Sequence, residues 1–101
     1  MAYSVRFHPL ARSDLFDLYH YIEGHSGPER AGIYLARIER LCTSLIDFPE
    51  RTVPRDDLLP GLRTVALERR VVVALTVTDT VVTILRVLYA GRDLSAGDVP
   101  L

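Results

Sequence analysis

The chain has 101 residues, nearly half of them apolar, and a formal net charge of −1 at pH 7. This length supports a single domain, residues 1–101, with one modest core, and the apolar content excludes a disordered chain. All twelve basic residues are arginines. Because acids balance them, the overall charge does not indicate a nucleic-acid binder.

The single cysteine, Cys42, excludes a disulfide framework and most cysteine-based metal sites. It lies in an apolar helical pattern, which predicts a buried thiol in a reducing compartment. The first ten residues do not have the pattern of a signal peptide. The longest apolar run, Val71–Leu75, is far too short to cross a bilayer. We therefore expect a soluble, cytoplasmic protein with no membrane contact.

The N-terminal half predicts a strand followed by a helical hairpin. Residues 3–7 alternate between apolar and polar side chains, as a short strand does. Apolar residues then recur at helical spacing over residues 9–23, and a second helix runs from Pro28 until residues 47–49 close it. The linker between the helices, residues 24–27, is so short that they must pack antiparallel.

Two features of this half and of the following loop have open interpretations. Phe16 projects away from the apolar stripe of the first helix, so it either packs against a loop or contacts a partner. Residues 49–60 contain three prolines and read as a loop. The apolar pair Leu58 and Leu59 within it either tucks under the loop or serves an external partner.

The C-terminal half predicts a meander of three strands. Runs rich in β-branched residues occupy Leu62–Leu67, Val71–Thr78 and Val81–Ala90. The breaks between them are too short for a crossover helix, so neighbouring strands pair antiparallel. The expected order, β-α-α-β-β-β, predicts an α+β fold whose antiparallel sheet is covered by the N-terminal helical hairpin. The first strand is expected at an edge of this sheet.

The residue types that usually carry chemistry do not form a recognisable site. His8, His20 and His25 lack the spacing of metal ligands, so no metal is expected. The sequence has no nucleophile in a known motif and no glycine-rich phosphate loop, and we expect no cofactor.

The arginines within apolar strand patterns are the remaining candidates, because an unpaired guanidinium is costly to desolvate. Alternation predicts Arg86 on the face of Ile84 and opposite Tyr89. One explanation is an internal ion pair with Glu68 or with an acid of the helical hairpin. The other is a concave sheet surface that offers several side chains to an acidic partner or to phosphate: Arg63, Arg86, Tyr89 and Arg92.

The chain resembles the ParE/RelE toxin superfamily of bacterial type II toxin–antitoxin modules. The features that carry the resemblance are the order of elements, the helix pattern LFDLYHYIE before a proline-opened second helix, PGLR at Pro60–Arg63 and ILRVLYAGRD at Ile84–Asp93. The likeness spans residues 3–93. It implies a small toxin that is neutralised, in a hetero-oligomer, by an antitoxin whose flexible C-terminal segment wraps it. The residues we expect to bind the antitoxin are Phe16, Tyr19, Leu58, Leu59 and Arg63.

Two activities divide the superfamily. RelE-like members cleave messenger RNA on ribosomes, which needs a general base, a general acid and cations. Arg63, Arg86 and Tyr89 match parts of that set by position. ParE-like members poison DNA gyrase without any catalysis of their own. The acids Asp56 and Asp57, the slight net negative charge and the lack of lysines favour the ParE-like branch.

On this interpretation the chain inhibits DNA gyrase, arrests growth and is neutralised by a ParD-like antitoxin. It then has no catalytic residue, and the residues expected to face the target are Arg86, Tyr89, Arg92 and Asp93. The alternatives are a RelE-like messenger-RNA endonuclease, with the ribosome as partner, and a non-toxic protein-binding module.

Overall fold

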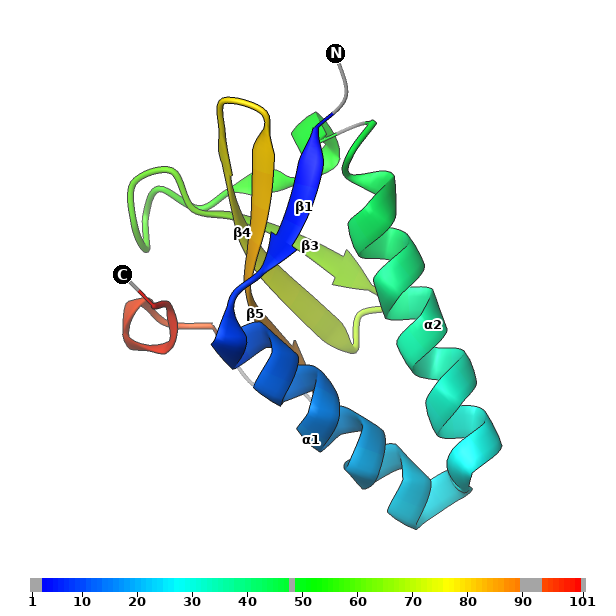
Figure 1. The fold of residues 1–101 in the computed structure, drawn as a ribbon. Helices are drawn as coiled ribbons and strands as arrows, with labels where there is room; N and C mark the ends of the chain where they lie inside the picture. The colour runs from blue at the N-terminus through cyan, green and yellow to red at the C-terminus, as the bar shows by residue number, and fades with distance from the viewer. Residues whose placement is uncertain (1–2, 48, 90–93, 101) are drawn as a thin grey trace.

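The structure, a computed structural model, describes residues 3–47, 49–89 and 94–100. A five-stranded sheet forms one layer, and two helices joined as a hairpin form a second layer over it (Figure 1). This is the predicted α+β fold, and β1 lies at a sheet edge as expected. The elements are β1 Ser4–Phe7, α1 Pro9–Ser26, α2 Pro28–Ser44, η1 Pro49–Arg51, β2 Val53–Pro54, β3 Arg63–Leu67, β4 Val71–Thr78, β5 Val81–Tyr89 and η2 Ala96–Asp98.

The helix α1 begins as predicted and continues further than predicted. The Nδ1 atom of His8 caps it by accepting a hydrogen bond from the Leu10 N–H at 3.1 Å. The predicted linker is wrong in length, because residues 24–26 stay helical and only Gly27 joins the two helices. Gly27 has φ 90° and ψ 165°, which only glycine adopts readily, so the break falls there.

The helix α2 ends at Ser44, before the residues 47–49 that the sequence predicts as its end. The Leu45 N–H donates to the Cys42 carbonyl at 3.2 Å, so the chain leaves the helix through a tighter turn. Cys42 is completely buried, as predicted, and burial, with a smaller contribution from Glu39, raises the pKa of its thiol to about 12. The described helices include none long and apolar enough to cross a bilayer.

The sheet has the order β1-β5-β4-β3-β2. β3, β4 and β5 form the predicted antiparallel meander, and β1 pairs parallel with the first half of β5. The β3–β4 turn has positive φ at both central residues, Glu68 and Arg69, a geometry that suits the twist of a tight hairpin. β2 lies in the segment predicted as a loop, and the sequence misses it because two residues have no periodicity.

The main core lies between the helical hairpin and the sheet, where Ile38 and Leu45 meet Val73, Leu75 and other strand residues. A second, smaller cluster covers the opposite face of the sheet. Its buried members are Leu62, Ala74, Leu85 and Val99, and its half-buried members are Leu58, Leu59 and Leu94. Both faces of the sheet are therefore covered by the chain itself over part of their area.

A bulge in β5 changes which side chains share a face. Leu75 pairs with Ile84 and the preceding Ala74 pairs with Arg86, so Leu85 is the additional residue. Tyr89 consequently lies on the helix-facing side with Ile84, while Arg86 lies on the opposite side with Ala74. The prediction that Arg86 and Ile84 share a face is wrong, because strict alternation does not allow for a bulge.

Candidate functional site

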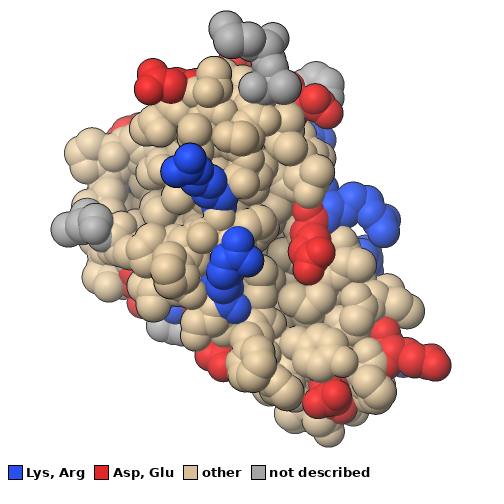
Figure 2. Space-filling model, in the orientation of Figure 1, with Lys and Arg blue, Asp and Glu red and all other residues tan. Residues whose placement is uncertain are grey.

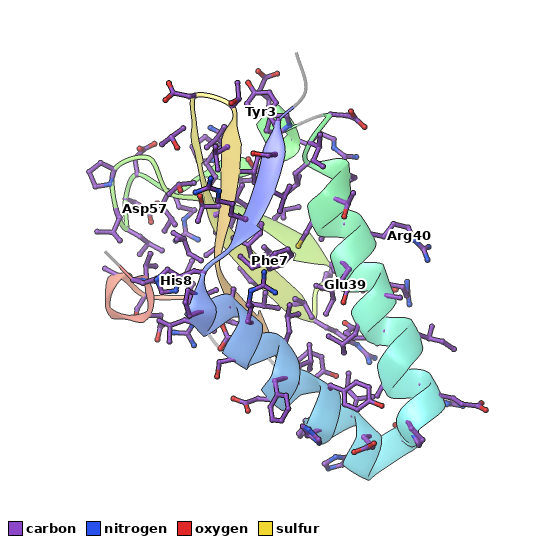
Figure 3. The ribbon with its side chains drawn as sticks, viewed as in Figure 1. Tyr3, Phe7, His8, Glu39, Arg40 and Asp57 are labelled. Atoms are coloured by element: carbon purple, nitrogen blue, oxygen red, sulfur yellow. The ribbon has the colours of Figure 1, made fainter. Side chains whose placement is uncertain are left out.

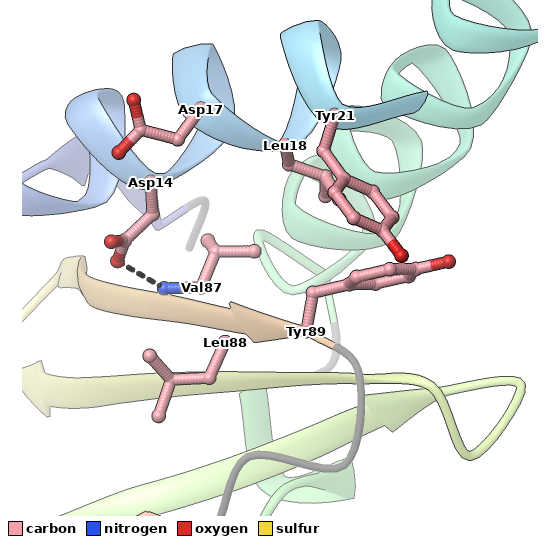
Figure 4. A pocket seen from close by; sticks show the side chains of 7 residues that line it. All are labelled: Asp14, Asp17, Leu18, Tyr21, Val87, Leu88 and Tyr89. Atoms are coloured by element: carbon pink, nitrogen blue, oxygen red, sulfur yellow. Dashed lines mark hydrogen bonds between the residues drawn. The ribbon is translucent and has the colours of Figure 1, made fainter. Parts of the chain in front are cut away.

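A furrow runs between α1 and the C-terminal half of β5. β1 pairs with β5 only as far as Ile84, so the following edge of β5 faces α1 instead of a strand. The hollow between them measures about 310 Å³ (Figure 4). The side chains that line it are Asp14, Asp17, Leu18 and Tyr21 from α1 and Val87, Leu88 and Tyr89 from β5.

At one end of the furrow Asp14 fastens α1 to the strand. Its carboxylate accepts two hydrogen bonds from the Arg86 guanidinium, at 2.7 and 2.9 Å. It accepts a third from the Val87 N–H at 2.9 Å, which Figure 4 shows. Arg86 also donates to the Asp98 carbonyl at 2.8 Å. The hydrogen bond to Asp14 raises the pKa of Arg86 against the opposing effect of burial. This contact is the internal ion pair that the sequence left as one explanation for Arg86.

At the other end the furrow opens into a basic pocket of about 330 Å³. We use "basic pocket" for the hollow lined by Tyr21, Ile22, His25, Ser26, Arg30, Tyr34, Arg70 and Tyr89. The Tyr89 ring contacts the rings of both other tyrosines in this pocket. Its centroid lies 5.7 Å from that of Tyr21 and 6.1 Å from that of Tyr34. Tyr21 and Tyr89 line both hollows, so the basic pocket adjoins the furrow at this pair of rings.

Tyr34 has an unusual environment within this pocket. Its hydroxyl oxygen is buried and makes no hydrogen bond within the part of the chain that the structure describes. Burial raises the pKa of Tyr34, the neighbouring Tyr89 adds to that shift, and the cations Arg70 and Arg37 oppose it. A buried hydroxyl without a partner carries a desolvation cost.

The structure does not bring Arg63, Arg86 and Tyr89 together. Arg63 donates to the hydroxyl and carbonyl oxygens of Thr52 at 2.6 and 2.8 Å, beside β2. Arg86 lies on the other sheet face, held by Asp14, and Tyr89 packs edge to face against Tyr21 and Tyr34. Arg92 and Asp93 lie outside the described residues.

The residues expected to bind an antitoxin fall on two separate surfaces. Phe16 is 65% exposed on α1, and its ring and the half-buried Tyr19 ring both contact His20. Leu58 and Leu59 pack on the opposite face of the sheet, in the smaller cluster. One groove therefore does not contain them all.

Sequence reasoning missed Tyr34, Arg30 and Arg70, which come from two different parts of the chain and share no local pattern. On the face that carries β1, basic and acidic side chains are interspersed and do not gather into a patch of one sign (Figure 2). Among the described residues no three His, Cys, Asp or Glu side chains are placed to hold a metal ion.

Comparisons with known proteins extend over nearly the whole chain. A family model described as ParE toxin of type II toxin-antitoxin system, parDE, matches residues 5–94. The fold is similar to a chain of the chromosomal ParDE TA system from P. aeruginosa, with TM-score 0.77, 26% identity, and coverage of 88% of this chain and 97% of that chain.

It is also similar to a chain of the toxin-antitoxin complex RelBE2 from Mycobacterium tuberculosis, with TM-score 0.70, 28% identity, and coverage of 89% of this chain and 100% of that chain. No curated protein matches the chain. The family match includes both α1 and β5, the elements that form the furrow.

Proposed function

Because the chain belongs to the ParE toxin family of type II toxin–antitoxin systems, we propose that it inhibits DNA gyrase and is neutralised by a ParD-like antitoxin. The similar chain from P. aeruginosa belongs to a ParDE system, which supports an antitoxin of the ParD class. On this proposal the toxin acts by binding its target and has no catalytic residue of its own.

The observation that carries the choice of gyrase is the separation of the three residues that RNA cleavage would need. Arg63 lies across from Leu75 and Tyr89 lies across from Val71. Four residues of strand place them roughly 13 Å apart along the sheet. Arg86 points to the other face. A general base, a general acid and a phosphate-binding cation must act on one phosphate, which this arrangement does not favour.

The distribution of charge also favours gyrase over RNA cleavage on ribosomes. The net charge is −1, and charges of both signs are interspersed on the face shown in Figure 2. Proteins that bind a polyphosphate surface usually present excess positive charge to it. A protein target fits this chain better than ribosomal RNA does.

The proposed target surface is the C-terminal end of β5 and the segment after it, with Arg86, Tyr89, Arg92 and Asp93. In this arrangement Arg86 positions the target surface. It hydrogen-bonds to Asp14 on α1 and to the Asp98 carbonyl, and so holds the residues around Asp98 beside β5. The antitoxin is proposed to contact Phe16 and Tyr19 on one side, and Leu58, Leu59 and Arg63 on another. An antitoxin segment that wraps around the toxin would reach both surfaces in a hetero-oligomer.

The test compares two activities of the purified toxin. With gyrase and relaxed plasmid we expect loss of supercoiling or accumulation of cleaved DNA, and we expect recovery when antitoxin is added first. In a translation extract the same concentration should leave messenger RNA intact. Cleavage of transcripts on ribosomes that is lost in Tyr89→Phe, with gyrase unaffected, would contradict the proposal and support the endonuclease.

A further inference from the structure

The furrow carries opposite charges at its two ends. Asp17 lies on the rim at the end where Asp14 holds β5 (Figure 4). The basic pocket at the other end has His25, Arg30 and Arg70, and none of the described residues that line it carries a carboxylate. Along α1, the eight residues from Asp17 to His25 correspond to about 12 Å.

Of the basic side chains in this pocket, His25 is already hydrogen-bonded through Nδ1 to the Tyr21 carbonyl at 2.7 Å, whereas the two arginines are not used inside the described part of the chain. Arg37, nearby on α2, pairs with Glu68, whereas the described residues provide no ion pair for Arg30 or Arg70. Tyr34 adds a buried hydroxyl that has no hydrogen-bond partner among the described residues. Two guanidinium groups that line one hollow and have no ion pair among the described residues suit a bound anion, which Arg can hold with paired hydrogen bonds.

The rest of the furrow favours a carboxylate on a polypeptide over the phosphates of a nucleic acid. A nucleic-acid strand that followed the furrow would bring its phosphates to Asp17, where like charges repel. A polypeptide can carry a single acid at one end and a neutral or basic residue at the other. It can also reach the outward-facing backbone groups of β5 at Tyr89, since β1 no longer pairs with the strand there.

We propose that the furrow binds a segment of the antitoxin that places an acidic side chain between Arg30 and Arg70. This inference rests on the proposed function, in which a ParD-like antitoxin neutralises the toxin. A segment in this position covers Tyr89 and so masks the end of β5 that is proposed to face gyrase. In an extended antitoxin segment, the residue that lies beside Asp17 would be about four positions from the acidic residue, because each strand residue advances the chain by about 3.3 Å.

The test measures the dissociation constant between the toxin and the purified product of the reading frame that adjoins its gene. The toxin variant Arg30→Glu with Arg70→Glu should bind at least about thirtyfold more weakly, because truncating or reversing a desolvated charge pair costs that much or more. The matched control is Arg40→Glu, a charge reversal on α2 whose side chain points away from the molecule (Figure 3). This control should change the constant by less than about threefold.

Exchanging charges between the two proteins tests whether an acidic residue of the antitoxin occupies the pocket, or whether the substituted toxin simply repels the antitoxin. Each acidic residue in the C-terminal half of the antitoxin is changed to arginine, and one such change should restore binding to the doubly substituted toxin while weakening binding to the native one. Circular dichroism confirms that each variant is folded.

Equal affinities for the double variant and Arg40→Glu, or recovery by none of the exchanges, would overturn the proposal. So would a double variant that keeps its affinity for the antitoxin but no longer binds a single-stranded oligonucleotide, since the pocket would then recognise phosphate. These binding measurements do not involve gyrase. Their result can therefore be interpreted even if the toxin does not inhibit supercoiling.

Discussion

At the scale of single residues, the contact between Arg86 and Asp14 joins three parts of the molecule. Each of the two charged side chains is only 13% exposed. The carboxylate satisfies the guanidinium and the Val87 N–H of the strand edge, and the guanidinium satisfies the Asp98 carbonyl. Charges with so little water around them are tolerated because every member of the group has a partner.

Removal of Asp14 should therefore be costly. Asp14→Ala leaves the Arg86 charge without its partner and the Val87 N–H without its acceptor. We expect the free energy of unfolding to fall by about 3 kcal/mol, measured by urea titration. Asp17→Ala, one turn further along the same helix and exposed, should change it by less than about 0.5 kcal/mol. Similar losses in both variants would show that the contact contributes no more than a surface charge.

At the scale of elements, the helical hairpin depends on one backbone conformation. Gly27 sits between α1 and α2 with φ 90° and ψ 165°, whereas Gly24 lies inside α1. A Cβ added at either position would meet nothing within 4 Å. The two glycines therefore differ in backbone conformation and not in available space.

This difference predicts opposite effects for the same substitution. Gly27→Ala forces a residue with a Cβ into a conformation that glycine alone favours, so it should destabilise the fold by about 1–3 kcal/mol. Gly24→Ala should stabilise it by about 0.5–1 kcal/mol, because alanine is the better helix former. Thermal unfolding of the two variants gives the comparison. A change of the same sign in both would mean that the hairpin does not depend on the Gly27 conformation.

The helices and strands were largely predictable from the sequence, but their mutual contacts were not. Periodicity was sufficient for the meander and the hairpin, because each of those patterns repeats within one segment. It missed the bulge at Leu85, which adds a residue that alternation cannot count, and so it misplaced Arg86. It also could not identify Asp14 as the partner of Arg86, 72 positions away. The basic pocket joins α1, α2 and the β3–β4 turn, so it exists only once these elements have packed.

At the scale of the whole molecule, the sheet is enclosed by two layers of unequal size. The helical hairpin covers one face with the main core. The loop before β3 and the segment around Val99 cover the other face with the smaller cluster. The hydrogen bond from Arg86 to the Asp98 carbonyl fastens this segment beside the end of β5, close to the proposed target surface.

A charge inserted into the smaller cluster tests whether the terminal segment is part of the cooperative fold. Val99 is 7% exposed against Leu62, Ala74 and Leu85. Val99→Asp cannot keep a carboxylate in this apolar setting, so the segment should detach, with a loss of about 2–4 kcal/mol in unfolding free energy. The detached segment would expose the apolar residues beneath it and increase the fluorescence of a dye that binds apolar surface.

Val53→Asp provides the control, because Val53 is 57% exposed on β2 and should tolerate the charge. If both variants leave stability and dye fluorescence unchanged, the smaller cluster contributes nothing to the fold. If only Val99→Asp responds, the sheet needs both layers. Because the terminal segment is tied to α1 through Arg86 and Asp14, its release should then weaken the proposed inhibition of gyrase as well as stability.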